Sequence, residues 1–502
     1  MKRFYLSVLL ALFVMPNMVA QTLQSESTDL KWMSRIEGIW AQFLGEYEGM
    51  QLVLSNYSKT PAIVVNWNTN GIVLEGFGPD GKVMKELKIN KVINSRVLVA
   101  NRVGDTVYMV GYALGKKLEY YDLYRWAVDL KTWSTVGQPE LIRTHKEKKM
   151  NDMDWKVSRT PDGSVIALAV RERREYAKVM GTWGKDPTEN NYLLVLDSRC
   201  RPLWQRDDLE GYYSNMVMDS NEVCHVLLAG RGNGKTYFMF LNHSSYADDV
   251  MLDSVMRDDI ERFRLLNWVN GNFVVGGLVS CGEVIVDGMQ YNALFALNYN
   301  ERTGQKKMNT RPLSDAEINI LANREIAAAT KRGKVNALNL REGCPTEWGG
   351  ALQVWRTYVE TVVTNGMSQS QWNITGSLIC GIDTNANFLW SAPIRSRQTS
   401  YEWSGELNQQ VFSKDGQVYV VQTEHANYAK DYENSKMMKL LHYIEPSQLA
   451  LYHINESGHV EKRVAEMGKA YLLWGDLIEQ KGEYMVVVGN NKGAKLVKLK
   501  GL

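Results

Sequence analysis

The sequence predicts an all-β fold, a β-propeller of about eight four-stranded blades, with seven blades as the alternative count. Three observations support this prediction. Near-repeats recur about every 45 to 60 residues, apolar residues alternate with polar ones, and tight turns such as Asp415-Gly416 separate the alternating segments. A four-stranded antiparallel sheet cannot bury both of its faces alone, so such repeats are expected to stack radially around a common axis.

Each near-repeat divides into an inner and an outer pair of strands. Val165, Ala167 and Ala169 illustrate the period of two that is typical of a strand with buried faces. The inner pairs are expected at residues 97–113, 155–170, 215–229, 263–279, 411–423 and 473–488, and the outer pairs at residues 72–87, 192–205, 293–307, 378–393 and 449–464.

The two ends of the chain are expected to meet in one blade. Strands at 484–488 and 494–499 leave the last repeat without a fourth strand. Residues 21–47 form a mixed lead-in that contains one strand or a short helix around 33–43. We therefore expect a segment near the N-terminus to complete the last blade, because a ring closed in this way leaves no exposed sheet edges between its ends.

Two insertions interrupt the repeats. Residues 313–332 predict a helix, because Ser314 and Glu317 have the spacing of a capping box and Gly333 follows as a stop signal. Residues 358–372 include a polar stretch and predict either a long hairpin extension or a mobile lip. Both insertions are expected on the loop-rich face of the ring, and no linker separates a second domain.

The first twenty residues have the pattern of an export signal. Lys2 and Arg3 precede an apolar stretch at 4–14, and Pro16 breaks that stretch before a cleavage site that ends at Ala20. An uncleaved anchor is the alternative, although the stretch is shorter than a membrane-spanning helix. We therefore expect residues 1–20 to be a signal peptide and residues 21–502 to be a single propeller domain. The mature protein is expected to be exported and soluble, in the periplasm, outside the cell or at the cell surface.

Composition and cysteine usage exclude several classes of protein. The chain is 45% hydrophobic and 23% charged with a formal net charge of +2, which is typical of a globular protein and does not favour nucleic acid as a partner. The five cysteines show no Cys-x-x-Cys spacing. Cys224 and Cys380 lie in apolar runs and are interpreted as small buried hydrophobic residues, although an oxidising compartment would allow one disulfide.

Several outer hairpins contain an apolar run, an Asp, a turn and a Trp. Asp197 precedes Trp204 in this way, and Asp383 precedes Trp390. These hairpins resemble the repeats of quinoprotein-type propellers, but they are too degenerate to imply the quinone cofactor of that family. As a whole, the chain resembles large, uncharacterised exported propeller proteins of Bacteroidetes-type bacteria, in its helical insertion and in the segment ICGIDTNANFLWSAPIRSRQ at 379–398. This resemblance implies the fold and export, and it supplies no active site.

The remaining motifs do not indicate a reaction. The glycine-rich segment 229–236 satisfies a relaxed phosphate-loop pattern, but a strand-like run follows where a phosphate loop needs a helix. We therefore predict a turn between two strands there. The seven histidines lack the spacing of a metal site, and no Gly-x-Ser-x-Gly nucleophile motif is present. We expect no metal, no cofactor and, on balance, no catalytic activity.

The unequal lengths of the connections indicate where a ligand binds. Turns such as 414–416 are minimal, whereas connections such as 171–190 and 425–436 are long, and binding residues concentrate on loops that a rigid scaffold positions. Aromatic rings with interleaved Arg and carboxylate side chains suit a sugar face or a polypeptide segment. The candidate ligand-binding residues are Arg174, Tyr176, Trp183, Arg395, Arg397, Tyr401, Glu402, Trp403, Glu424, His425 and Tyr428.

Three hypotheses for function follow. In the first, the exported propeller is not catalytic and binds a glycan or a protein partner on its loop-rich face. In the second, the protein is a glycan-active hydrolase or lyase, in which Glu402 or Glu424 acts with His425 or Tyr401 as acid or base. A hydrolase needs two carboxyl groups roughly 5 to 10 Å apart. In the third, the chain is a structural subunit of an envelope assembly, with the helix at 313–332 as a docking element.

Overall fold

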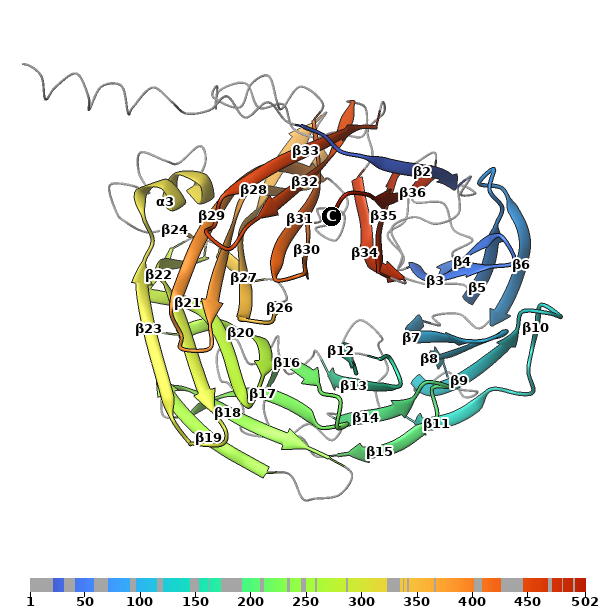
Figure 1. Cartoon of the computed structure of the whole chain (residues 1–502), viewed down its shortest axis with the longest axis horizontal. Helices are drawn as coiled ribbons and strands as arrows, with labels where there is room; N and C mark the ends of the chain where they lie inside the picture. The colour runs from blue at the N-terminus through green and yellow to red at the C-terminus, as the bar shows by residue number, and fades with distance from the viewer. Residues whose placement is uncertain are drawn as a thin grey trace, which may run out of the picture.

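The computed structural model shows an eight-bladed β-propeller, in which eight antiparallel sheets stand around a central axis (Figure 1). The sequence left the number of blades open between seven and eight, and the structure has eight. The structure describes residues 21–30, 41–57, 71–90, 96–114, 121–144, 153–160, 162–172, 192–207, 212–232, 235–244, 250–257, 260–285, 288–322, 335–336, 338–340, 343–364, 367–400, 409–425, 446–467, 472–480, 482–490 and 493–502.

Blades 1 to 4 follow one another along the chain, each with its first strand nearest the axis (Figure 1). Blade 1 contains β3 (Ala41–Tyr47), β4 (Met50–Tyr57), β5 (Gly71–Phe77) and β6 (Val83–Asn90). Blade 2 contains β7 (Arg96–Val103), β8 (Thr106–Leu114) and β9 (Tyr121–Asp129), with β10 (Ser134–Thr135) and β11 (Glu140–Thr144) both on β9. Blade 3 contains β12 (Met153–Arg159), β13 (Val165–Glu172), β14 (Tyr192–Asp197) and β15 (Pro202–Arg206). Blade 4 contains β16 (Tyr212–Met218), β17 (Cys224–Gly232), β18 (Lys235–His243) and β19 (Val250–Arg257).

Blades 5 and 6 have the longest strands and enclose the helical insertion. Blade 5 contains β20 (Ile260–Val269), β21 (Asn272–Ile285), β22 (Gly288–Asn300) and β23 (Lys306–Pro312), and β24 (Val335–Asn336) pairs with β22. Blade 6 contains β25 (Leu338–Leu340) and β26 (Cys344–Thr346), both on β27 (Gly349–Thr364), followed by β28 (Met367–Asp383) and β29 (Phe388–Ser400). Helix α3 (Asp315–Ala322) lies between these two blades in the chain.

A strand from the N-terminal segment completes the last blade, as the sequence predicted, and another adds a fifth strand to the blade before it. Blade 7 contains β30 (Gln409–Lys414), β31 (Gln417–His425), β32 (Ser447–Ile454) and β33 (Val460–Glu466), and β1 (Gln21–Thr22) adds to its outer edge in parallel. Blade 8 contains β34 (Leu472–Gln480), β35 (Glu483–Asn490) and β36 (Gly493–Leu499), and β2 (Ser25–Leu30) is its fourth, antiparallel strand. The sequence did not indicate the additional strands β1, β11 and β24.

Every pair of neighbouring blades shares one hydrophobic cluster, and the eight clusters together form the core. Alternation produces this arrangement, because successive residues of a strand face opposite neighbours. In β4, for example, Leu54 packs with Met109 of blade 2, whereas Val53 packs with Val487 of blade 8. Polar side chains of the inner strands add bonds between blades. Asn267 of β20 donates to the carbonyl oxygens of Thr346 and Gly349, both at 2.8 Å.

The connections differ between the two rims of the ring. Within a blade, the links between the first and second strands, and between the third and fourth strands, are two to six residues long. These links lie at one rim of the ring, which we call the tight-turn rim. At the opposite rim, here the long-connection rim, strand-to-strand links reach 13 residues at 58–70, 19 at 173–191 and 21 at 426–446. Asp415 and Gly416 show the tight-turn chemistry. Their φ angles of 51° and 73° are those of a two-residue hairpin turn, which favours Asp-Gly.

The two insertions start as the sequence predicted. Ser314 N–H donates to Glu317 Oε2 at 2.7 Å, and Glu317 N–H donates to Ser314 Oγ at 3.3 Å, which confirms the capping box. The structure describes the helix as Asp315–Ala322, and the rest of the predicted range, 323–332, lies outside the described residues. The second insertion is a hairpin extension, because β27 and β28 remain paired up to Thr364 and Met367.

Two smaller predictions also have clear outcomes. The glycine-rich segment is a hairpin turn, because Gly232 of β17 pairs with Lys235 of β18. None of the five cysteines is in a disulfide. Cys224 and Cys380 are fully buried, and burial raises the pKa of both thiols far above the ordinary range, as expected for small core residues.

We predict that β2 stabilises blade 8. A chain that begins at residue 31 loses the strand that covers the outer edge of β36, so the backbone of β36 is expected to exchange its amide hydrogens at least about tenfold faster than in a chain that begins at residue 21. Hydrogen exchange measured by mass spectrometry tests this. Strands β17 and β18 are the internal control, and equal protection of β36 in both chains would show that the N-terminal strand does not close the ring.

Candidate functional site

The interface between blades 6 and 7, which we call seam 6–7, has an apolar half and a polar half. Toward the tight-turn rim, Ile379 and Ala392 of blade 6 pack with Val418, Val420 and Ile454 of blade 7. Successive residues on the same face of a strand are two apart, so the next residues toward the long-connection rim extend the same interface. There the residues become polar, as Gln422 and Glu424 follow Val418 and Val420 along β31.

Buried polar side chains are concentrated in these two blades. Among the described residues, 22 polar or charged side chains are buried, and 11 of them belong to blades 6 and 7. Buried polar groups lower stability unless they are hydrogen-bonded, so such a concentration has to be compensated by a network. We call the following residues of seam 6–7 the polar layer: Gln353, Ser377, Gln409, Gln422, Glu424, Gln448, Tyr452 and Lys462.

A chain of side-chain amides crosses the seam. Gln353 Nε2 of β27 donates to Gln409 Oε1 of β30 at 2.8 Å, and Gln409 Nε2 donates to Gln422 Oε1 of β31. Gln422 Nε2 in turn donates to Glu424 Oε1 at 2.7 Å and to the carbonyl oxygen of Arg395 at 3.3 Å. Gln409 and Gln422 each accept on one side and donate on the other, so the chain runs in one direction from Gln353 and ends at the carboxylate.

Glu424 is the end point of this chain and is only 4% exposed. Its Oε1 accepts hydrogen bonds from Gln422 and from the hydroxyl of Tyr452. Its Oε2 accepts from Lys462 Nζ at 2.6 Å and from Gln448 Nε2 at 3.2 Å. A carboxylate has about four acceptor positions, and donors occupy all four here. Glu424 is therefore a buried, paired carboxylate, and this arrangement leaves no acceptor position for a substrate proton.

The structure brings together two of the residues that the sequence selected. Glu424 is buried at the end of β31, and Arg395 of β29 is half-buried with its carbonyl oxygen bonded to Gln422, the residue that donates to Glu424. His425 is also buried, but it lies on the opposite face of β31, toward blade 8. Arg397 lies in β29, but its side chain is outside the described set. The other candidates, Arg174, Tyr176, Trp183, Tyr401, Glu402, Trp403 and Tyr428, lie outside the described residues, so direct contact with a ligand stays a prediction for this set.

Sequence reasoning missed most of the polar layer. Gln353, Gln409, Gln422 and Gln448 lie on four strands and have no common sequence motif. A signal was nevertheless present in β31, where the apolar alternation Val418, Val420 continues into Gln422 and Glu424 at positions that face a core. A polar residue at a predicted core position indicates either a buried network or a functional site.

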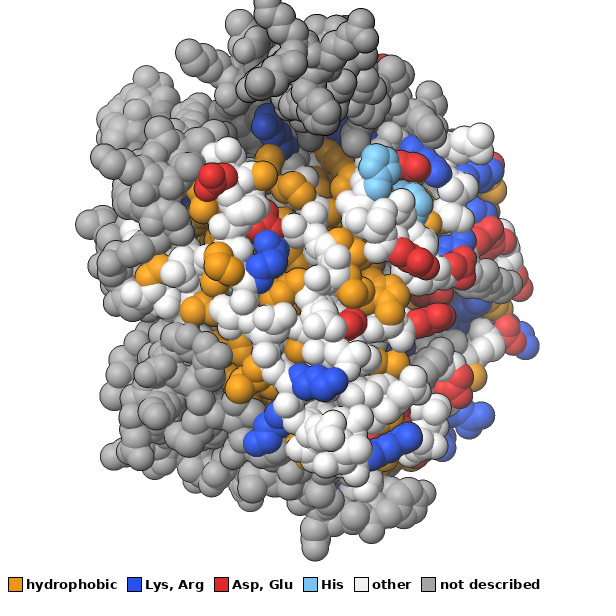
Figure 2. All heavy atoms as spheres, turned by 60° about the vertical axis from the view of Figure 1, so that its left-hand side comes forward, with side chains coloured by type: hydrophobic (Ala, Val, Ile, Leu, Met, Phe, Trp, Pro, Cys, Tyr) orange, Lys and Arg blue, Asp and Glu red, His pale blue; other side chains and the backbone are white. Residues whose placement is uncertain are grey.

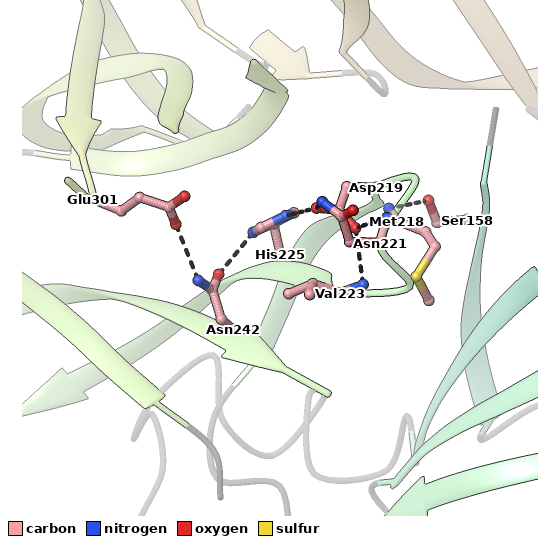
Figure 3. Close-up of polar contacts among 8 residues, drawn as sticks. All are labelled: Ser158, Met218, Asp219, Asn221, Val223, His225, Asn242 and Glu301. Carbon is pink, nitrogen blue, oxygen red and sulfur yellow. Dashed lines mark hydrogen bonds and ion pairs between the residues drawn. The ribbon is translucent and has the colours of Figure 1, made fainter. Parts of the chain in front are cut away.

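A second, partly buried network lies at the tight-turn rim and joins blades 3, 4 and 5 (Figure 3). His225 of β17 lies between Asp219 and Asn242, with Nε2 at 3.2 Å from Asp219 Oδ2 and Nδ1 at 2.7 Å from Asn242 Oδ1. Asn242 Nδ2 donates to Glu301 Oε2 of blade 5 at 3.0 Å. At the other end, Ser158 Oγ of blade 3 accepts the N–H of Met218 at 3.0 Å.

This second network stabilises the blades and does not resemble a nucleophile site. Because Asn242 donates to Glu301, its oxygen faces His225, and both nitrogens of the His225 ring face acceptors. The ring also stacks on Trp268 of blade 5 with centroids 3.8 Å apart. Neither ring nitrogen faces a hydroxyl group, so His225 has no nucleophile to activate in this geometry.

The described surface has mixed charge. In the view of Figure 2, acidic and basic side chains are interspersed, and hydrophobic side chains gather toward the middle of the face. In the described part of the chain, no group of three or more His, Cys, Asp or Glu side chains is placed to hold a metal ion. Among the same residues, no helix is both long and apolar enough to cross a membrane.

The fold defines the class of the protein as a β-propeller, and comparisons with known proteins go no further. No protein-family model matches the chain, and no curated protein matches it. Among solved structures, it is similar to the β-propeller domain of the Trilobed protease from Pyrococcus furiosus, at 12% identity and a TM-score of 0.37 over 81% of this chain and 94% of that chain. It is also similar to the Dos1 propeller, at 7% identity and a TM-score of 0.38 over 95% of this chain and 96% of that one.

A third similarity is to the acylaminoacyl peptidase of Pyrococcus horikoshii, at 10% identity and a TM-score of 0.37. That alignment covers 81% of this chain but only 51% of the peptidase chain, so this chain corresponds to about half of the peptidase. The assignment of the fold rests on the strand pairing of this chain itself.

We predict that Lys462→Met lowers the free energy of unfolding by about 3–5 kcal/mol, because it leaves the carboxylate of Glu424 buried without its counter-charge. Denaturant unfolding measures this loss, and the double variant Lys462→Met/Glu424→Gln is expected to recover part of it. The control is Lys82→Met, which breaks an exposed ion pair with Asp80 and should change stability by less than about 1 kcal/mol. Equal losses for both lysines would contradict the buried pair.

We also predict that the hydrogen bond between Asp219 and His225 stabilises blade 4. Asp219→Asn keeps the turn, since Asn455 makes the same backbone contacts in its own turn, but it removes the charge that faces His225. The control is Asp197→Asn, because Asp197 accepts the equivalent N–H groups of Arg199 and Arg201. Thermal or denaturant unfolding should show a loss larger by about 1.5–3 kcal/mol for Asp219→Asn than for Asp197→Asn. Equal losses would show that only the turn matters.

Proposed function

We propose that this protein is a non-catalytic binding propeller that holds a glycan or a polypeptide segment at the long-connection rim, above blades 6 and 7. The observation that supports this most is the position of the polar layer. Its members Gln409, Glu424 and Gln448 lie at the ends of β30, β31 and β32, where the connection 401–408 ends and the connection 426–446 begins and ends. These connections contain Tyr401, Glu402, Trp403 and Tyr428.

A rigid base under long connections suits a binding role. The amide chain and the Glu424–Lys462 pair fix the strand ends at which the connection 401–408 ends and the connection 426–446 begins, and a fixed base reduces the conformational entropy that binding has to overcome. The paired state of Glu424 also favours binding over hydrolysis, because a glycan hydrolase needs carboxyl groups that can exchange protons with the substrate.

Export of the protein is part of the proposal. It is supported by the charged and apolar pattern of residues 1–20 and by the resemblance to exported propeller proteins of Bacteroidetes-type bacteria. An exported binding protein meets glycans and the surfaces of other proteins, which agrees with the aromatic and arginine content of the long connections.

Replacing Tyr401 and Trp403 by Ala is predicted to weaken binding by at least about 30-fold, because aromatic residues supply most of the energy at binding surfaces. The ligand is first identified with a glycan array and a pull-down, both with protein that begins at Gln21. Titration of that ligand into the unmodified protein and into the Tyr401→Ala/Trp403→Ala variant then gives the two affinities. A saccharide and a protein are separate outcomes of the first step.

The matched control lies on the opposite rim. Lys131 and Glu456 are exposed in tight turns, so the double variant Lys131→Ala/Glu456→Ala is expected to bind normally. Unchanged binding by the Tyr401/Trp403 variant, or equal loss in both double variants, would move the binding surface away from blades 6 and 7.

A further inference from the structure

The interface between blades 1 and 8, here called the closing seam, joins the first complete repeat of the chain to the last. Its hydrophobic cluster is the smallest in the described part of the ring. It has five buried members, whereas the clusters of the other seams have 11 to 18. The five are Val53 and Phe77 of blade 1 and Met485, Val487 and Leu496 of blade 8.

A carboxyl group is buried in this seam. Glu75 lies in β5, in which all seven residues are buried, and it is only 6% exposed. It pairs directly with Val53 of β4, and antiparallel partners share a face of the sheet. Glu75 therefore lies on the face of Val53 and Phe77, toward blade 8, whereas its neighbour Leu74 packs toward blade 2.

The carboxyl group of Glu75 is poorly compensated, in contrast to that of Glu424. Its Oε2 has no hydrogen-bond partner among the described residues, and neither has Ser55 Oγ on the same face of β4. The residue directly opposite on β6 is another acid, Glu86, which forms an ion pair with Lys88 at 3.3 Å. Leaving an ionised carboxylate in such an environment is unfavourable.

The other charged groups of the seam lie nearer its solvent-exposed margin. The pairing of β35, β36 and β2 shows which charged side chains of blade 8 face blade 1. They are Glu483, Lys498 and Glu26. Glu483 is paired with Lys498, and Glu26 with Lys500. On the blade 1 side, Glu46 of β3 lies opposite Gln51 of β4 and is exposed, and the described side chains of β4 on this face supply no titratable group.

The direction of the pH effect follows from this environment. Burial raises the pKa of Glu75 from 4.5 to about 7, the charge of Glu86 adds to the increase, and Lys88 opposes it. Between these two values the unfolded or opened state releases a proton that the closed state keeps. The closed state is therefore favoured fully below about pH 4.5, and this contribution is lost as the pH rises through 7.

We propose that the closing seam is a proton-dependent latch: protonated Glu75 lets blades 1 and 8 pack together, and its ionisation loosens that seam while the other seven stay closed. Three features place the device here. The carboxyl group is buried, it faces the opposite blade, and its Oε2 has no hydrogen-bond partner among the described residues. Loosening is local, because the N-terminal strands still tie blades 7 and 8 to the chain that leads into blade 1.

Hydrogen exchange of the intact protein at pH 5.5 and pH 8.5 tests the latch, with rates corrected for the intrinsic effect of pH. The shift from 4.5 to about 7 predicts that protection of β5 and β35 falls about 30-fold between these two pH values. Strands β17 and β18 of blade 4 are the internal reference and should change little. An equal fall in blade 4, or none in β5 and β35, overturns the proposal.

The variant Glu75→Gln isolates the carboxyl group. It is expected to abolish the pH-dependent fall in β5 and β35, because a side-chain amide does not ionise in this range. The matched control is Glu86→Gln on the neighbouring strand, whose side chain is 36% exposed, and it should keep most of the fall. A fall in Glu75→Gln equal to that of the unmodified protein overturns the proposal. If Glu75→Gln does not fold, the exchange of the unmodified protein decides alone.

Discussion

The burial of both faces of every sheet is the constraint on which the rest of this structure depends. A four-stranded sheet with apolar residues on both faces needs two neighbours, and only a closed ring gives every blade two. The eight hydrophobic clusters, one per seam, are the direct result. Closure also explains the use of the N-terminal segment, because β2 supplies the fourth strand that the last repeat lacks and covers the outer edge of β36.

The seams are not equivalent, and the differences indicate where the protein departs from a purely structural ring. Among the described residues, the seam between blades 5 and 6 has the largest cluster, to which helix α3 adds Ile318 and Leu321. Seam 6–7 is apolar at one rim and polar at the other. The other seams supply enough packing to hold the ring, so individual seams can contain groups that lower stability. Such groups are expected where a protein binds or switches.

Two buried glutamates show how differently the same residue type is treated. Glu424 receives four hydrogen bonds, one of them from Lys462, and so remains compatible with a charge in the core. Glu75 has an unbonded oxygen and faces a second acid, and its pKa rises accordingly. The first arrangement gives rigidity below the long connections, and the second gives sensitivity to pH at the place where the ring closes. Neither property depends on the identity of the ligand.

The sequence by itself determined the features that depend on neighbouring residues. Alternation gave the inner and outer strand pairs, Asp415-Gly416 gave a tight turn, Ser314 and Glu317 gave the capping box, and the strand that follows Gly232 excluded a phosphate loop. Counting repeats left seven or eight blades open, because the lead-in and the shared last blade have no clear repeat of their own.

Only the tertiary structure decided which side chains meet across a seam. Gln353 and Gln409 are 56 residues apart and contact each other because two blades pack face to face, and no local pattern encodes that contact. The same holds for Glu75, because nothing in the residues next to it in the sequence indicates that its side chain faces blade 8. The ligand-binding role of residues such as Trp183 and Trp403 remains a prediction from sequence. The polar layer beneath the connections is apparent only in the assembled ring, because burial is a property of the packed blades.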